Sequence, residues 1–250
     1  LPKNLTEIAK QIKLQGADVG FVVDPDVDRL CMVCENGEMF GEEYTLVAVA
    51  DYVLKNTKGN TVSNLSSTRA LKDVTHKNGG TYFASGADIA SKHRSPCFRT
   101  KIGEGYVVEG MIKHNAIAGG EGNGGIIYPV SHYGRDALVG IALFLTHLAK
   151  SNLKCSELRA SYPNYYISKN KIELTPQINV DKILTTIANT YKNEEVNTID
   201  GVKIDFDNGW VHLRKSNTEP IIRIYAESNT MKNAEEIAAE IIKKVEQIIS

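Results

Sequence analysis

Three clusters of polar residues have the types and spacing to support chemistry. The first is the run Asp24-Pro25-Asp26-Val27-Asp28-Arg29, in which three carboxylates alternate within five residues. Carboxylates this close repel one another, and a hard divalent cation with oxygen ligands is the usual way to offset that repulsion. The adjacent Arg29 favours magnesium together with a phosphate, because a guanidinium grips phosphate oxygens in a forked geometry.

Two other interpretations of this acidic run stay open. Asp24, Asp26, Asp28 and Glu35 fall at the first, third, fifth and twelfth positions of a calcium-binding EF-hand loop. That loop needs glycine at its sixth position, where this chain has Arg29, and the flanking segments are predicted strands instead of helices. A solvated acidic turn without any ligand is the other interpretation.

The second cluster is the segment Gly119 to Gly125, which has five glycines in seven residues. Glycines let a backbone approach a ligand closely. Glu121 and Asn123 are the only polar side chains of the segment. A carboxylate and an amide can accept from and donate to neighbouring hydroxyls, as sugar recognition requires. A turn with no ligand is the alternative.

The third cluster is the run Arg214-Lys215-Ser216-Asn217-Thr218-Glu219-Pro220, with Arg223 close behind. The run connects two predicted strands, so we expect it at a loop tip. Two arginines, two hydroxyls, an amide and backbone N–H groups together form a good cradle for an oxyanion. The alternative is a polar hairpin loop with surface arginines.

The surrounding elements place these clusters on loops. The acidic run connects strands predicted at 18–23 and 30–34, and the glycine-rich segment lies between a helix that begins near 106 and an apolar helix after Asp136. Strand–helix–strand alternation up to residue 84 is a βαβ signature and predicts a parallel sheet. From about residue 158, runs of strands with flanking helices predict a separate α+β domain. The sequence shows no convincing internal repeat.

Composition excludes several classes of partner and site. Lys and Arg number 29 against 30 Asp and Glu, which argues against a nucleic-acid footprint or a membrane-surface patch. No apolar run reaches the ~20 residues of a membrane span. Four cysteines are too few for a disulfide scaffold, so we expect a reducing, cytoplasmic location. Cys31 and Cys34 form a C-x-x-C, for which buried packing is favoured over a zinc or redox site; Cys97 and Cys155 are far away in sequence.

Taken together, the clusters resemble the motifs of the α-D-phosphohexomutase superfamily. That family has a metal loop D-x-D-x-D-R, a sugar loop G-G-E-x-S/N-G and a phosphate loop R-x-S-N-T-E-P with a trailing arginine. All three occur here in that order, and the segment Thr100 to Glu104 is similar to the family's T-x-V-G turn. The resemblance covers nearly the whole chain.

The resemblance implies a fold and an activity. The expected fold is α/β, with a mixed sheet sandwiched by helices and a C-terminal α+β domain. Residues 1–38 would be the end of domain two, 39–158 domain three and 159–250 domain four. The expected activity is a phosphomannomutase/phosphoglucomutase that interconverts hexose 1-phosphate and hexose 6-phosphate through a phosphoserine and a bisphosphate intermediate. Phosphoglucosamine mutase and a non-catalytic phosphosugar-binding protein are the alternatives.

The resemblance also assigns roles, residue by residue. It implies magnesium at the three aspartates of the acidic run, and contact of Arg29 with the phosphoryl group in transfer. It implies sugar hydroxyls at Glu121 and Asn123. The phosphate that is not reacting would be anchored by five residues of the third cluster: Arg214, Ser216, Asn217, Thr218 and Arg223.

This sequence departs from the family pattern in several places. The nucleophile loop S/T-A-S-H-N-P is absent, so a chain limited to these residues is predicted to be inactive. Gly125 stands where many members have a histidine that ends the sugar loop, and Ser66 stands where some have a lysine. The general acid and base therefore stay unassigned. Residues 85–100 form a longer connection than is usual in the family. Oligomeric state is not predicted.

Overall fold

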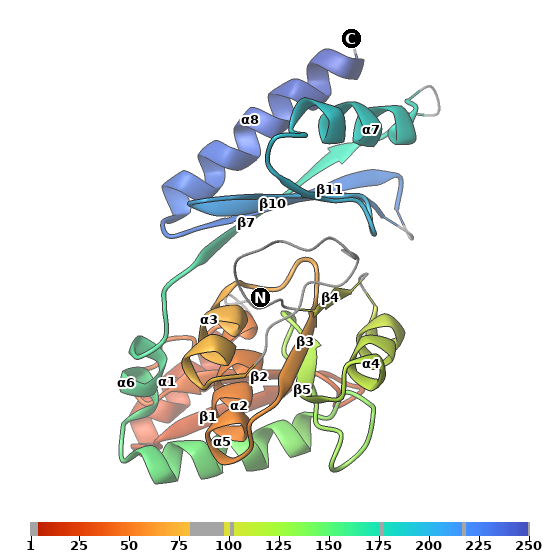
Figure 1. The fold of residues 1–250 in the computed structure, drawn as a ribbon. Coiled ribbons are helices and arrows are strands. Elements are labelled where there is room, and N and C mark those ends of the chain that lie inside the picture. Colours follow the sequence, from red (N-terminus) through yellow and green to blue (C-terminus); the bar gives the residue numbers. More distant parts are fainter. Residues whose placement is uncertain (1–4, 81–97, 101–102, 176–177, 217–218, 250) are drawn as a thin grey trace. The chain divides into compact units, whose positions relative to one another are not determined.

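The structure is a computed structural model that describes residues 5–80, 98–100, 103–175, 178–216 and 219–249 (Figure 1). The chain divides into two compact units, residues 1–163 and 164–250. The finer three-part division predicted from the sequence stays a prediction. In the described part of the chain, no helix combines the length and the apolar character needed to cross a membrane. The long connection at 85–100 falls mostly outside the described residues.

The first unit begins with a helix and a strand pair. Helix α1 (Thr6–Gln15) ends at Gly16 in the left-handed conformation. Strands β1 (Val19–Val23) and β2 (Leu30–Cys34) then pair antiparallel. Because the two strands are joined directly, the acidic run forms the tight loop between them, where the Asp24 N–H donates to the Arg29 carbonyl at 3.4 Å. A turn at Asn36-Gly37 follows β2, with Gly37 at a φ of 81°.

The main sheet of the first unit has four strands in the order β4-β3-β5-β6. Strands β3 (Asn60–Asn64), β4 (Phe98–Thr100) and β5 (Ala116–Glu121) are parallel, as the βαβ pattern predicts. Strand β6 (Gly125–Ile127) runs antiparallel to β5. The two strands are antiparallel because the connection between them is short, whereas a parallel strand would need a crossover of about a dozen residues. The sheet is therefore mixed, as the resemblance implies.

Helices cover both faces of this sheet (Figure 1). A Cβ on Gly119 would meet Met111 of α4 (Glu104–Lys113), whereas a Cβ on the next residue, Gly120, would approach Leu46 of α2 (Glu42–Asn56). Successive strand residues point to opposite faces, so α4 and α2 lie on opposite sides. Helix α3 (Ala70–Lys77) packs on α2 and β3. Ten of the 15 residues of α2 are buried, which makes it the central helix of the unit.

The strongly apolar sequence after Asp136 predicts a buried core helix, but this helix is only half buried in the structure. In α5 (Ala137–Ser151) the Phe144 ring is fully buried and packs edge-on against Phe40, with ring centroids 5.1 Å apart. On the other face, Leu138 is 64% and Leu145 is 42% exposed. Hydrophobicity alone did not reveal which face packs, because both faces are apolar. Helix α6 (Cys155–Ala160) completes the unit.

The first unit contains a structural repetition that the sequence does not show. The order helix, strand, short connection, strand, helix occurs as α1-β1-β2-α2 and again as α4-β5-β6-α5. In both cases the two strands are antiparallel neighbours. The acidic run and the glycine-rich turn occupy the same place in the two copies. Their residues differ completely, so no sequence comparison within the chain pairs them.

The second unit is a five-stranded antiparallel sheet with two helices. Its strand order is β7-β11-β10-β9-β8, from β7 (Tyr166–Glu173), β8 (Glu195–Asn197), β9 (Val202–Phe206), β10 (Gly209–Lys215) and β11 (Ile221–Ser228). Helices α7 (Val180–Thr190) and α8 (Met231–Ile249) pack on one face through a core that includes Ile187, Ile224 and Ile241. This is the α+β domain that the sequence predicts. The basic run lies where β10 turns into β11.

Candidate functional site

The acidic loop is held together by its own arginine. Asp24 Oδ1 accepts hydrogen bonds from the backbone N–H groups of Asp28 and Arg29, both at 3.2 Å, and Asp24 Oδ2 accepts from Arg29 Nε at 2.7 Å. Burial raises the pKa of Asp24, but the hydrogen bonds from Arg29 and Asp28 outweigh it and lower that pKa to about 2. The Arg29 side chain is about half exposed, so its guanidinium also faces solvent.

The glycine-rich turn lies directly against the end of this loop. The Leu30 N–H donates to the Gly124 carbonyl at 3.1 Å, and Arg29 forms a β-bridge with Gly125. Gly124 has a φ of 86°, and a Cβ there would be 2.3 Å from the Leu30 carbonyl oxygen. Only glycine combines this backbone conformation with so close an approach. Gly124 is therefore needed for the contact between the glycine-rich turn and the end of the acidic loop.

Glu121 is a buried carboxylate at the end of β5, and it is 5% exposed. Its Oε1 accepts from Asn64 Nδ2 at 2.9 Å and from the Gly103 N–H at 3.2 Å, and its Oε2 accepts from Asn123 Nδ2 at 3.4 Å. Gly103 belongs to the predicted T-x-V-G turn, whose residues 101 and 102 lie outside the described part. These donors hold the carboxylate in place where β5 ends and the glycine-rich turn begins.

Arg135 connects the two loops, although it belongs to none of the three clusters visible in the sequence. Its guanidinium pairs with Asp28, with Glu121 at 3.0 Å and with Glu104 at 3.3 Å. Ala137, two residues after Arg135, donates its N–H to the Val27 carbonyl at 3.1 Å. The available signal was its position, since Arg135 immediately precedes the residue that caps α5. A cation next to a helix cap is too common to single out without the fold.

The charge of this cluster, which we call the acidic cluster (Asp24, Asp26, Asp28, Glu104 and Glu121 with Arg29 and Arg135), is unbalanced. Five carboxylates face two guanidinium groups. Asp28 Oδ1 is buried and accepts no hydrogen bond within the described part of the chain. Burial raises the pKa of Asp28. Hard oxygen donors in excess, one of them without a hydrogen bond, are the donor chemistry that suits a magnesium ion.

The three aspartates do not converge on one point in this conformation. Among the described residues, no group of three or more His, Cys, Asp or Glu side chains is arranged to hold a metal ion. Asp24 is bound to Arg29, Asp28 to Arg135, and Asp26 is exposed. The donor types fit the ion that the sequence predicts, while the placement shown is that of a loop whose carboxylates are paired with arginines.

The third cluster lies in the second unit and forms a row of cations across three strands. Arg214 of β10 is the register partner of Arg223 of β11, and Arg223 is the partner of Lys171 of β7. Like charges directly opposite one another destabilise a sheet. Two carboxylates offset this repulsion: Arg223 pairs with Glu219 at 2.5 Å and Lys171 with Glu173 at 2.7 Å. Lys171 is not recognisable from the sequence, because only strand register brings it beside the loop.

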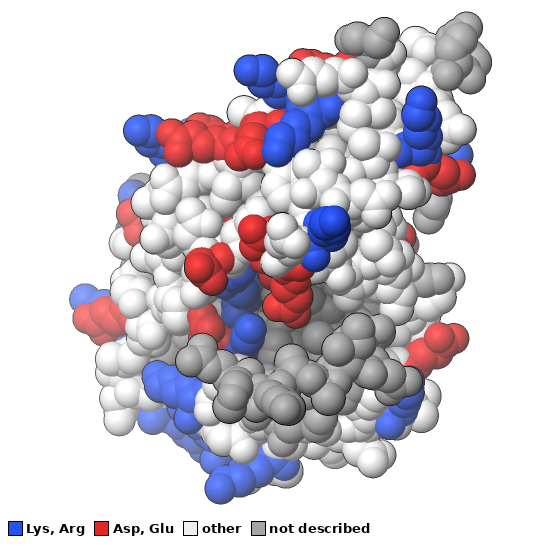
Figure 2. Space-filling model, turned by 45° about the horizontal axis from the view of Figure 1, so that its top comes forward, with Lys and Arg blue, Asp and Glu red and all other residues white. Residues whose placement is uncertain are grey.

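The rest of the predicted phosphate loop is described in part. Ser216 is buried, and its N–H donates to the Ile221 carbonyl at 2.9 Å, which closes the loop. Asn217 and Thr218, which the sequence also predicts, lie outside the described residues. The structure thus joins the acidic run to the glycine-rich turn within the first unit, and it groups Arg214, Ser216 and Arg223 within the second. On the face of the molecule in Figure 2, acidic and basic side chains are interspersed.

Comparison with known proteins gives two family matches, and the border between them lies close to the border between the two units. Residues 84–166 match the phosphoglucomutase/phosphomannomutase family model for the alpha/beta/alpha domain III, and residues 170–244 match the model for the C-terminal domain. A phosphoglucomutase/phosphomannomutase of Thermococcus kodakarensis is 34% identical over 249 residues. A phosphoglucosamine/phosphogalactosamine mutase of Sulfurisphaera tokodaii is 33% identical over 248 residues. The matches cover 99% and 97% of this chain but 51% of each relative, so the chain spans about half their length.

Solved structures show the same fold. A phosphoglucomutase/phosphomannomutase family protein of Burkholderia thailandensis matches 99% of this chain and 50% of its own with a TM-score of 0.79, at 22% identity. An Aspergillus fumigatus N-acetylphosphoglucosamine mutase, in complex with GlcNAc-6P and magnesium, matches 90% of this chain and 51% of its own with a TM-score of 0.61, at 14% identity. With both family models matched in order and the predicted motifs on the expected elements, the chain belongs to the α-D-phosphohexomutase superfamily.

Proposed function

We propose that the chain is part of a phosphohexomutase that interconverts hexose 1-phosphate and hexose 6-phosphate, as a phosphomannomutase/phosphoglucomutase. The transfer would pass through a phosphoserine and a bisphosphate intermediate. One observation carries the proposal: Arg135 and the Leu30–Gly124 hydrogen bond join the acidic run to the glycine-rich turn in a single acidic cluster. Two unrelated motifs that share one cluster are expected where a metal and a sugar must meet.

Magnesium would be held by Asp24, Asp26 and Asp28. When bound, the ion supplies positive charge that offsets the negative charge on a phosphoryl group in transfer. The excess of carboxylates in the acidic cluster and the buried Asp28 Oδ1 support this assignment. Arg29 would contact the same phosphoryl group, because its half-exposed guanidinium keeps N–H donors beside the loop.

Sugar hydroxyls would be held by Glu121 and Asn123. Asn64, Gly103 and Arg135 already orient Glu121, so its carboxylate loses little freedom when a hydroxyl binds. The phosphate that does not react would be anchored by Arg214, Ser216, Asn217, Thr218 and Arg223. The cation row supports that role, since a phosphate would relieve the repulsion between Arg214 and Arg223. Lys171 would join the row at its outer end.

The nucleophilic serine is not among the assigned residues, because the chain has no S/T-A-S-H-N-P run. We propose that the 250-residue chain alone binds substrate and does not turn it over. A glucosamine phosphate is the second candidate substrate, favoured by the relative named phosphoglucosamine/phosphogalactosamine mutase. We also propose that the protein is cytoplasmic.

Isothermal titration calorimetry of the chain with the 6-phosphates of mannose, glucose and glucosamine tests the phosphate clamp. We expect weak binding that Arg214→Ala and Arg223→Ala each reduce at least tenfold, since a charge-assisted bidentate contact contributes about 1.5–3 kcal/mol. Lys215→Ala is the matched control, because Lys215 is an exposed cation next to Arg214 whose side chain points to the other sheet face. Equal loss in the control, or unchanged binding in both arginine variants, would remove the clamp assignment.

The metal assignment is tested separately by titration with magnesium alone. We expect Asp26→Asn to weaken magnesium binding, because Asp26 is the exposed carboxylate of the acidic run. Asp18→Asn is the matched control, since Asp18 directly precedes β1 and lies at the strand end away from the acidic loop. Magnesium affinity that is the same in both variants would contradict the assignment while leaving the phosphate clamp untouched.

A further inference from the structure

Two buried thiols from distant parts of the first unit lie in contact. Cys34 is the last residue of β2 and Cys155 is the first residue of α6, and each is 1% exposed. Their side chains are hydrogen-bonded to each other. The residues that follow them are also joined, because the backbone N–H of Ser156 donates to Glu35 Oε2 at 3.0 Å and the Ser156 hydroxyl donates to Glu35 Oε1. These bonds to the Glu35 side chain tie the start of α6 to the residue that follows β2.

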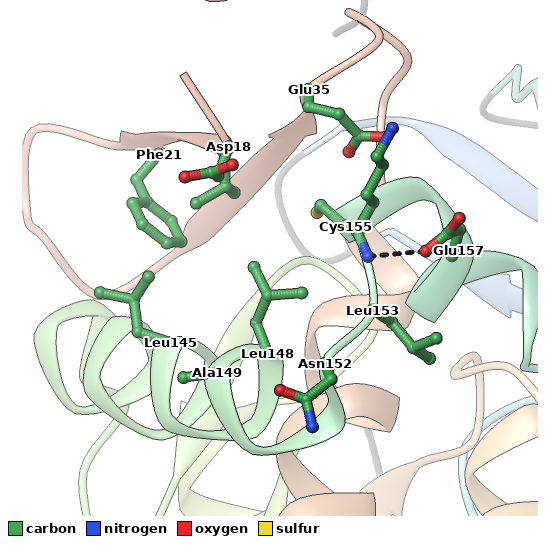
Figure 3. A pocket seen from close by; sticks show the side chains of 12 residues that line it. Asp18, Phe21, Glu35, Leu145, Leu148, Ala149, Asn152, Leu153, Cys155 and Glu157 are labelled. Atoms are coloured by element: carbon green, nitrogen blue, oxygen red, sulfur yellow. Dashed lines mark hydrogen bonds between the residues drawn. The ribbon is translucent and has the colours of Figure 1, made fainter. Parts of the chain in front are cut away.

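A cavity gives small molecules access to this pair. Cys155 and Glu35 line a space of about 770 Å³ that is open to solvent, together with Phe21 of β1 and Leu145 and Leu148 of α5. Figure 3 shows Cys155 and Glu35 on one side of this cavity and the α5 leucines on another. A molecule the size of a peroxide fits such a space easily. Cys155 lines this cavity, so a small oxidant that enters it meets the thiol pair at Cys155.

The two thiols differ in acidity. The hydrogen bond from Cys155 lowers the pKa of the Cys34 thiol, although burial opposes this. The same hydrogen bond, together with burial, raises the pKa of Cys155. Cys34 is therefore the thiol that ionises more readily, and Cys155 keeps its proton. A thiol of lowered pKa next to a second thiol is the arrangement found where one cysteine attacks and the other resolves.

We infer that Cys34 and Cys155 form a redox pair that peroxides convert to a disulfide, which ties β2 to α6. One sulfur of the pair, as its thiolate, attacks one oxygen of the peroxide, the O–O bond breaks, and a sulfenic acid forms on that cysteine while the other oxygen leaves as water after taking up a proton. The second sulfur then attacks the sulfur of the sulfenic acid, the S–O bond breaks, and the hydroxyl leaves as a second water with the proton of the second thiol. In total, the two thiols lose two electrons, and one peroxide molecule gains them.

The disulfide would act on the whole first unit. It closes a loop from residue 34 to residue 155, which contains the glycine-rich turn and Arg135. A cross-link over so long a loop restricts the unfolded chain strongly, so the oxidised protein should melt later, by on the order of 10 °C. The inference differs from the C-x-x-C interpretation of the sequence, because the partner of Cys34 is Cys155 and not Cys31.

The test is to treat the folded chain with hydrogen peroxide and to map its thiols by mass spectrometry, in a Cys97→Ser background. We expect a mass decrease of about 2 Da, for two lost hydrogen atoms, a cross-linked peptide that joins residues 34 and 155, and reversal by a reductant. Cys31→Ser is the matched control and should leave the cross-link and the rise in melting temperature unchanged. Cys34→Ser and Cys155→Ser should each abolish both.

The cross-link is measured in the Cys97→Ser chain, so the inference is tested even if the Cys34→Ser or Cys155→Ser variant folds poorly. A disulfide between residues 31 and 34, oxygen added to Cys34 without a cross-link, or thiols that stay reduced in the folded chain would each overturn the inference. A 34–155 disulfide that leaves the melting temperature unchanged would overturn the stabilising role.

Discussion

At the scale of single residues, the acidic cluster is a charge balance that two arginines only partly complete. Arg29 neutralises Asp24 within the loop, and Arg135 connects the loop to Glu121 and Glu104. Because Arg135 contacts both motifs by ion pairs, the position of Asp28 relative to Glu121 depends on it. The two arginines therefore differ in role: Arg29 organises one loop, whereas Arg135 sets the distance between two.

Removing the Arg135 guanidinium should destabilise the first unit. We expect Arg135→Gln to lower the free energy of unfolding by about 2–4 kcal/mol, because it leaves three carboxylates without their shared partner. Arg135→Lys should recover only part of the loss, since an ammonium cannot form the forked contacts. Urea denaturation measures both values. Complete recovery in the lysine variant would show that charge alone matters.

The pKa of Asp24 predicts how the acidic loop responds to acid. Its folded pKa of about 2 lies below the model-peptide value of 3.8, so the contribution of Asp24 is fully present above pH 4 and is lost as pH falls through about 2. Asp24→Asn should therefore lose less stability than the wild type between pH 4 and pH 2. Asp26→Asn, at an exposed residue of the same loop, should follow the wild type. Parallel curves for Asp24→Asn and the wild type in urea denaturation would contradict the assignment.

At the scale of elements, the site depends on two strand pairs whose connections touch. Each is an antiparallel pair flanked by helices, β1-β2 and β5-β6. The contact between them is a backbone hydrogen bond from Leu30 to Gly124, so side chains are not needed for the join itself. This explains how the same arrangement can present aspartates from one connection and a glutamate from the other.

Gly124 tests the importance of that join. We expect Gly124→Ala to cost about 2–4 kcal/mol of unfolding free energy, because alanine meets both an unfavourable φ and the Leu30 carbonyl. Gly16→Ala is the matched control: Gly16 also has a positive φ, but a Cβ there has open space. The control should cost only about 1 kcal/mol. Equal losses in urea denaturation would mean that the close approach is not a constraint.

At the scale of the whole molecule, the chain consists of two units with separate cores, and each holds one half of the proposed chemistry. The acidic cluster belongs to residues 1–163 and the cation row to residues 164–250. Because each core is closed within its unit, the units are expected to unfold as separate cooperative transitions. The chain spans about half the length of the curated relatives that it matches.

Calorimetry can detect the two units separately. We expect two heat-absorption transitions, and we expect Ile224→Ala, in the core of the second unit, to lower only one of them. Loss of a buried isoleucine costs about 2–5 kcal/mol, enough for a visible shift. Val62→Ala, in the core of the first unit, should lower the other. A single transition that both variants lower together would show that the units unfold as one.

The sequence by itself determined the motifs, their loop positions and the α+β character of the second unit, because strand and turn preferences are local and charged runs are visible in one dimension. It also predicted the mixed, helix-covered sheet through its family resemblance. It did not show Arg135, Lys171, the Cys34–Cys155 contact or the exposed face of α5. Each of these depends on which distant segments pack together and in what register, and such contacts are formed only when the chain folds.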